Sequence, residues 1–331
     1  MGKVGGITTF DRSPIYTLAQ SGTAIGRKKV DKGKRLQGKG TELGNKSRLL
    51  KWAKKKLISQ TLVLKLADLA RQRGDLDQMQ SYYNTWHCFN KVTSANGRLF
   101  GKYCGNRFCP LCCGIRKAKK INQYLPVLKN WKDPFFLTIT AQSVDCDSLE
   151  RRTDEMFILL RQIIAKHKKR FQRAKGQKFM GVYSFECNFS PIKQTYNPHF
   201  HLILPDLKTA DTILVEWRKR GLEKWGKETV KQAAQCNKRV KDIEKNLVEI
   251  LKYSSKIFTE PDDDKQKKVD PVICVAAYYN IIEVMKGRRI FDRFGFNLPE
   301  RVKPIQESQV VDSIQEWCYS MKYTDWIQIE G

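Results

Sequence analysis

The sequence predicts an α+β protein, in which a central antiparallel sheet with helices follows a cysteine-rich module and a basic N-terminal arm. Three observations predict this order. Apolar and polar residues alternate in three stretches between residues 134 and 205, whereas the segments around them repeat apolar residues at helical spacing. Five of the ten cysteines lie between Cys88 and Cys113, and the first 60 residues are rich in Lys, Arg and Gly. With 331 residues and 41% hydrophobic content, the chain can fill a core.

The charge balance predicts an anionic partner. The chain has 62 Lys and Arg against 34 Asp and Glu, a net charge of +28. Such an excess is typical of proteins that bind a polyanion such as DNA or RNA. No apolar stretch of about 18 residues is present, and the N-terminus lacks the apolar core of a signal peptide. We therefore expect a cytoplasmic protein without a membrane role.

The chain is expected to begin with a flexible basic arm over residues 1–60, which has few apolar residues before Leu57. Apolar residues at steps of three and four predict an amphipathic helix over 57–76. This helix and the cysteines that follow it should form a module over residues 61–130.

The sheet is expected within a domain over residues 131–300. Strands are predicted at 134–141, 178–190 and 199–205, and a helix over 147–171 separates the first two. Asn197 before Pro198 indicates a hairpin turn over 193–198, which would make the second and third strands antiparallel.

Helical periodicity dominates after the third strand. Helices are predicted at 209–225, 241–258 and 271–287, with an acidic run over 261–268 as a solvated loop. The tail over 301–331 contains Trp317, Tyr319 and Trp326, but no pattern that predicts a structure.

Two of the four histidines, His199 and His201, lie two residues apart in the third strand. Side chains of a strand alternate between its faces, so both imidazoles project to one side and Phe200 to the other. Glu186 in the preceding strand could add a carboxylate on the same side. Two histidines and one oxygen ligand with open positions suit catalytic Mg²⁺ or Mn²⁺. The alternative is a pair of hydrogen-bonded histidines without a metal.

Glu249 and Tyr253 lie four residues apart in the helix predicted over 241–258, and hence on one helix face. A tyrosine hydroxyl can form a phosphodiester that keeps the energy of the broken bond, and a nearby carboxylate can activate water or a second hydroxyl. The spacing alone is equally compatible with a packed tyrosine and a solvated glutamate.

Cys88, Cys104, Cys109 and Cys112 have the spacing of a closed structural zinc site. Cys113 or His87 could replace one of these ligands, and reduced cysteines in a small core are the alternative. Basic residues surround the cluster and could hold DNA phosphates or form a solvated surface. They are Arg107, Arg116, Lys117, Lys119 and Lys120.

The sequence resembles the rolling-circle plasmid replication initiators of the HUH endonuclease superfamily, specifically the bacterial type with one Tyr and one Glu in its active site. Four blocks carry the resemblance in order: YCGNRFCPLCCGIRKAKK at 103–120, FFLTIT at 135–140, YNPHFHLIL at 196–204 and VEILKYSSK at 248–256. A weaker fifth block is MKGRRIFDRFG at 285–295. The chain departs from the pattern in its long basic arm and in the doubled cysteines at 112 and 113.

The resemblance implies an HUH endonuclease fold and a metal-dependent enzyme that nicks single-stranded or hairpin DNA at a plasmid origin. His199 and His201 would bind the catalytic metal, Tyr253 would form the 5′-phosphotyrosine link, and Glu249 would assist the terminating cleavage. The freed 3′ hydroxyl would prime a host polymerase, with a helicase unwinding ahead. The alternatives are a transposase or relaxase of the same superfamily, or a nonenzymatic zinc-containing nucleic-acid-binding protein.

Overall fold

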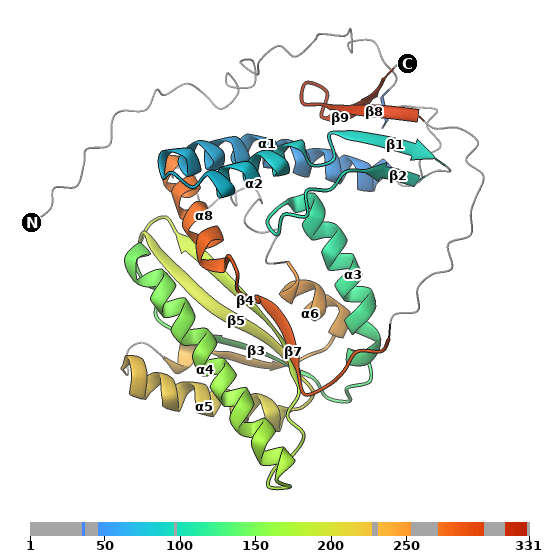
Figure 1. Cartoon of the computed structure of the whole chain (residues 1–331). Helices are drawn as coiled ribbons and strands as arrows, with labels where there is room; N and C mark the ends of the chain where they lie inside the picture. The colour runs from blue at the N-terminus through green and yellow to red at the C-terminus, as the bar shows by residue number, and fades with distance from the viewer. Residues whose placement is uncertain are drawn as a thin grey trace, which may run out of the picture.

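The computed structural model describes residues 35–36, 46–95, 98–226, 231–252, 271–300 and 315–329. Two sequence predictions, Tyr253 and the acidic loop over 261–268, lie outside the described residues, as does most of the arm over residues 1–45. The described chain is an α+β protein, as the sequence predicts, but it has two antiparallel sheets where the sequence predicts one (Figure 1). No helix among the described residues is both long enough and apolar enough to cross a bilayer.

The central sheet has five strands in the order β6-β3-β5-β4-β7, and every neighbouring pair is antiparallel. The three predicted strands form its middle, and two short strands that the sequence did not predict form its edges. The strands are β3 (Phe135–Thr140), β4 (Gly181–Ser190), β5 (Thr195–Leu204), β6 (Cys236–Arg239) and β7 (Phe291–Phe294).

The hairpin between β4 and β5 is antiparallel as predicted, but its turn lies earlier than the Asn197–Pro198 pair indicates. Residues 191–194 form the turn, and Gln194 adopts a positive φ of 50° there. Asn197 and Pro198 lie within β5 and pair with β4. Because the β3 ladder ends at His199, the missing N–H of Pro198 interrupts no β3–β5 hydrogen bond.

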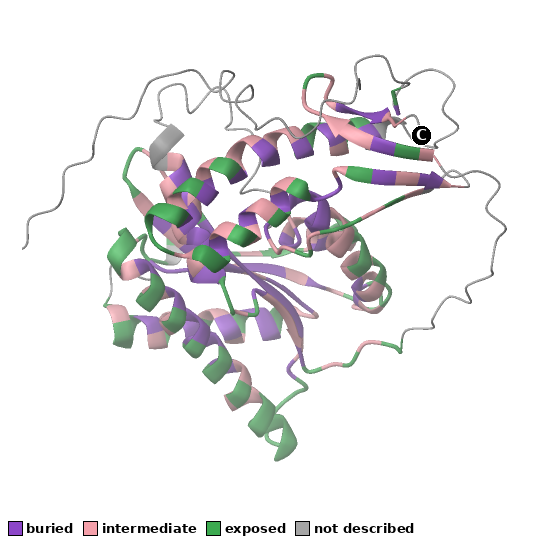
Figure 2. Cartoon of the chain, turned by 45° about the horizontal axis from the view of Figure 1, so that its top comes forward, coloured by how far each residue is buried: buried purple, intermediate pink, exposed green. Residues whose placement is uncertain are grey.

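Helices cover both faces of the central sheet, whose middle strands are mostly buried (Figure 2). One face shares a core with α4, α5 and α8, in which Phe185 and Phe200 are fully buried. The other face packs Val182 and Ile203 against α3 and α6. These helices are α3 (Pro110–Leu128), α4 (Cys146–Gln172), α5 (Leu207–Trp225), α6 (Ile243–Ile250) and α8 (Pro271–Met285).

The C-terminal tail, for which the sequence predicted no structure, completes a second sheet with the cysteine module. The order is β2-β1-β8-β9, and the strands are β1 (Lys91–Ala95), β2 (Arg98–Gly101), β8 (Gln315–Ser320) and β9 (Asp325–Gln328). Trp317 and Trp326 are fully buried, and their indole N–H groups donate to Ser94 Oγ and the Phe89 carbonyl, each at 2.9 Å. The two tryptophans thus tie the tail to the cysteine module.

The first helix begins earlier than the sequence predicts. Helix α1 spans Lys46–Gln72 and therefore includes residues 46–60, which we expected to belong to the flexible arm. Leu49 and Ala53 are buried against the tryptophans of the second sheet, and this tertiary packing outweighs the charged local composition. A turn at Gly74, with φ of 74°, leads into α2 (Leu76–His87).

Candidate functional site

Three strands of the central sheet bring the histidine pair and Glu186 to one face. In the register of β3, β5 and β4, His199 lies between Thr140 and Glu186. His201 lies two residues further along β5, between Thr138 and Ser184. Directly opposed residues project to the same side of a sheet, so the two rows form one polar patch. Phe200, between the histidines, projects into the opposite core.

Both imidazoles present their Nε2 atoms to the same carboxylate oxygen. Glu186 Oε2 lies 3.3 Å from His201 Nε2 and 3.8 Å from His199 Nε2. The candidate ligand atoms of the three residues all lie within 4.8 Å of one another, which is compatible with a shared metal ion. Glu186 and His199 are only 2% and 5% exposed, and a buried carboxylate requires a compensating positive charge.

The opposite nitrogen of each imidazole is held by a neighbouring group. His199 Nδ1 lies 2.9 Å from the Asn197 carbonyl, and His201 Nδ1 lies 2.9 Å from Thr138 Oγ1. A proton on Nδ1 of His199 donates to that carbonyl and leaves the Nε2 lone pair for a metal. Such outer hydrogen bonds are typical of metal-ligating histidines, and the donor set therefore fits a cation.

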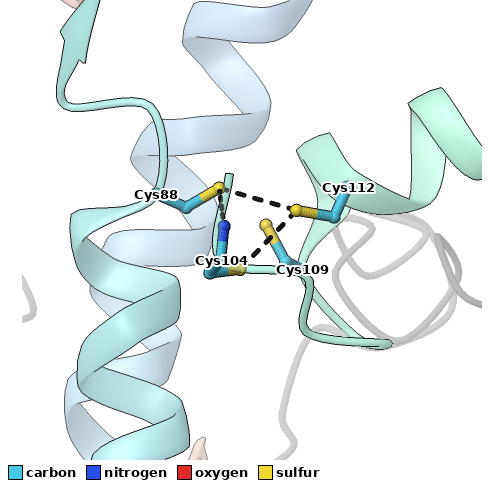
Figure 3. A group of neighbouring side chains, drawn as sticks. All are labelled: Cys88, Cys104, Cys109 and Cys112. Atoms are coloured by element: carbon cyan, nitrogen blue, oxygen red, sulfur yellow. Dashed lines mark hydrogen bonds between the residues drawn. The ribbon is translucent and has the colours of Figure 1, made fainter. Parts of the chain in front are cut away.

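The four predicted zinc-site cysteines meet at the junction of α2, the β2–α3 connection and α3 (Figure 3). Cys88 follows α2, Cys104 lies in the connection, Cys109 is the N-cap of α3 and Cys112 is in its first turn. The Cys112 sulfur lies 3.7 Å from that of Cys88 and 3.6 Å from that of Cys104.

These separations fit a tetrahedral ion. A tetrahedron with metal–sulfur bonds of about 2.3 Å has sulfur–sulfur edges of about 3.8 Å. Hydrogen bonds among the four thiols lower the pKa of Cys104 and raise those of Cys88 and Cys109, so Cys104 is favoured as the thiolate, which is the form that binds metal.

The two alternative ligands lie apart from this group. The Cys113 thiol donates to the Arg107 carbonyl at 2.7 Å, and the His87 ring stands edge-on to Trp86.

Lys56, which the sequence analysis placed in the arm, lies beside the cysteines. The residue is 2% exposed, and its ammonium group donates to the Cys88 carbonyl. Burial lowers the pKa of Lys56 to about 8, whereas the nearby cysteines act in the opposite direction. No local pattern in the sequence distinguishes this lysine from its charged neighbours.

Glu249 lies on α6, which covers the face of the sheet that carries the histidines. Its carboxylate pairs with Lys252 and is about two-fifths exposed, with a side-chain value of 39%. The helix was expected to continue through Tyr253, but it ends at Ile250, where the Lys252 N–H bonds to the Glu249 carbonyl in a tightened last turn. The predicted one-turn relation of Glu249 to Tyr253 thus lies outside the described residues.

The predicted DNA-binding cations divide into three groups. Arg107 donates to the backbone carbonyls of Met285 and Arg288. Arg116 donates to those of Cys112, Gly105 and Asn106. Lys117 and Lys120 line a cavity together with both arginines, whereas Lys119 is exposed on α3. Arg289, which the sequence analysis did not select as a site residue, lines the same cavity.

One curated relative is similar to this chain. Protein rep of Staphylococcus aureus is 31% identical over 165 residues, which cover 46% of this chain and 69% of the relative. No family model matches the chain. No solved structure matches it.

Proposed function

This chain belongs to the family of the staphylococcal Protein rep, and on that premise we propose that it initiates rolling-circle replication of a plasmid. In this proposal the protein is an HUH-type endonuclease that nicks one DNA strand at the origin and later rejoins it. The convergence of Glu186, His199 and His201 carries the proposal, because a protein that binds nucleic acid through charge alone gives these three residues no joint role.

Glu186, His199 and His201 would hold Mg²⁺ or Mn²⁺, since one carboxylate and two imidazoles leave positions open for substrate oxygens. When bound, the cation would polarise a phosphodiester oxygen and stabilise the charge that develops at phosphorus. Thr138 and the Asn197 carbonyl hold the imidazoles in the orientation that exposes Nε2.

Tyr253 is proposed as the nucleophile. Its hydroxyl oxygen would attack phosphorus to form a 5′-phosphotyrosine link, and the 3′ oxygen would leave with a proton as the primer hydroxyl. Glu249 would activate water or a second hydroxyl in the terminating cleavage. Support for these two roles comes from the ordered resemblance of the blocks at 196–204 and 248–256 to the replication initiators.

Cys88, Cys104, Cys109 and Cys112 would hold structural Zn²⁺, in agreement with their sulfur–sulfur distances. The basic residues beside this module would contact DNA: Arg107, Arg116, Lys117, Lys119 and Lys120. A host helicase and a polymerase would complete the replication machinery.

A covalent-trapping experiment tests the proposal. The full chain is incubated with Mn²⁺ and single-stranded oligonucleotides from its own replicon, and products are separated on a denaturing gel. We expect a protein–DNA adduct that is lost in Tyr253→Phe and in His201→Ala. Tyr323→Phe, a tyrosine in the turn between β8 and β9, is the matched control and should retain the adduct. Absence of any adduct, or an adduct in Tyr253→Phe, refutes the assignment.

A further inference from the structure

A basic cavity lies between α3, the C-terminal end of α6 and the start of β7. Its volume is about 230 Å³, and its lining includes Arg107, Arg116, Lys117, Lys120 and Arg289. The lining contains no Asp or Glu among the described residues. Like charges gathered in one recess repel one another, so this arrangement favours an anion as ligand.

Among the cations that line the cavity, the two lysines are the least engaged by other protein groups. Arg107 and Arg116 are held by carbonyl oxygens, and Arg289 pairs with Asp292 at 3.1 Å. Lys120 and Lys117 make no ion pair within 4 Å in the described part of the chain. Lys120 instead places its ammonium group 3.9 Å from the centre of the Phe291 ring, which fixes its direction.

The surroundings of both lysines disfavour their charge until an anion arrives. The pKa of Lys120 is lowered to about 8, chiefly by burial, with Asp292 acting against this shift and Arg116, Arg107 and Arg289 in the same direction as burial. Burial also lowers the pKa of Lys117, with Lys252 and Lys55 acting in the same direction and Glu249 against it.

The sheet register places the cavity near the Glu186–His199–His201 group. Phe291, which lines the cavity, pairs with Ser184 on β4, and Ser184 pairs with His201 on β5. These partners share a face of the sheet and are two strand spacings apart, or about 10 Å. That separation is short enough for one DNA strand to reach both places.

We propose that this cavity binds one backbone phosphate of the single-stranded DNA that enters the Glu186–His199–His201 site, with Lys117 and Lys120 as its charged contacts. The inference rests on the proposed function, because it takes the same DNA as ligand. It adds a second anchor on the strand, close to the reacting phosphate, which would set the register of cleavage.

Equilibrium binding tests this anchor without any cleavage step. Fluorescence anisotropy of labelled oligothymidylate of about 20 nucleotides, which is longer than typical site sizes, is recorded without added Mg²⁺ or Mn²⁺. Removing one phosphate contact to a single strand should reduce the slope of log K against log salt by about 0.7, which is about fivefold in affinity at 0.1 M salt. We expect this loss in Lys120→Met and its recovery in Lys120→Arg.

Lys129→Met is the matched control, because Lys129 is an exposed cation at the opposite end of α3 and should leave the slope unchanged. If Lys120→Met lowers the melting temperature, Lys117→Met replaces it in the same assay. Equal slopes for the wild type, Lys120→Met and Lys117→Met overturn the proposal. A loss confined to double-stranded DNA overturns it as well.

The covalent-trapping result is independent of this assay. A missing adduct together with a reduced slope in the lysine variants refutes the nicking function and retains the phosphate site. A normal adduct with unchanged slopes retains the nicking function and refutes the phosphate site.

Discussion

Thr138→Val should weaken metal binding without removing any metal ligand. The substitution keeps the shape of the side chain but removes the hydroxyl that lies 2.9 Å from His201 Nδ1. His201 then loses the partner that orients its ring, while Glu186 and His199 retain their positions. Loss of such an outer partner typically reduces metal affinity about 10- to 100-fold, or about 1.4 to 2.7 kcal/mol.

The assay is a titration of Mn²⁺ against the zinc-loaded protein, with free Mn²⁺ followed by its electron paramagnetic resonance signal. Thr93→Val is the matched control, since Thr93 is a half-buried strand threonine in the second sheet. Glu186→Gln sets the upper limit for the loss of Mn²⁺ affinity, because it replaces the carboxylate by a neutral amide. If Thr138→Val and Thr93→Val bind Mn²⁺ as the wild type does, the hydroxyl does not orient His201.

Three further predictions follow from the described geometry. Cys104→Ser should release zinc and lower the free energy of unfolding by several kcal/mol in urea titrations, on the order of a lost structural metal, whereas exposed Cys236→Ser should not. Affinity for oligothymidylate should fall as pH rises through about 8, because Lys120, whose pKa is lowered to about 8, loses its charge there. Anisotropy measured from pH 7 to 9 should show a weaker dependence of affinity on pH for Lys120→Met than for the wild type. Glu249→Gln should spare the first nick and slow the terminating cleavage, and loss of the first adduct would contradict that role.

Much of the central sheet follows from local pattern. Its three long strands alternate apolar and polar residues, and the period of two correctly places His199 and His201 on one face. The edge strands β6 and β7 have only four residues each, with sequences CNKR and FDRF, and carry no alternation strong enough to predict them. Their structure depends on pairing with neighbours distant in the sequence.

The candidate sites likewise include features that local pattern predicts and features that depend on distant contacts. Cysteine spacing identified four thiols that converge, whereas the opposition of Glu186 to His199 required the register of two strands. Lys56 could not be found because its burial depends on carbonyls at the end of another helix. The end of α6 at Ile250 was also missed, since the residues after it continue the helical pattern.

The tail strands can pair with the cysteine module only late in translation. Trp317 donates to Ser94 across 223 residues, and Trp326 donates to the Phe89 carbonyl across 237. At about 5 to 20 residues per second, a ribosome needs roughly 10 to 50 seconds to translate that interval. During this time Cys88, Cys109 and Cys112 lack the tryptophans that share their core. Until the tail strands pair, the cysteines of the candidate metal site are therefore less covered and more open to oxidation, and a chain shortened before residue 315 would keep them so.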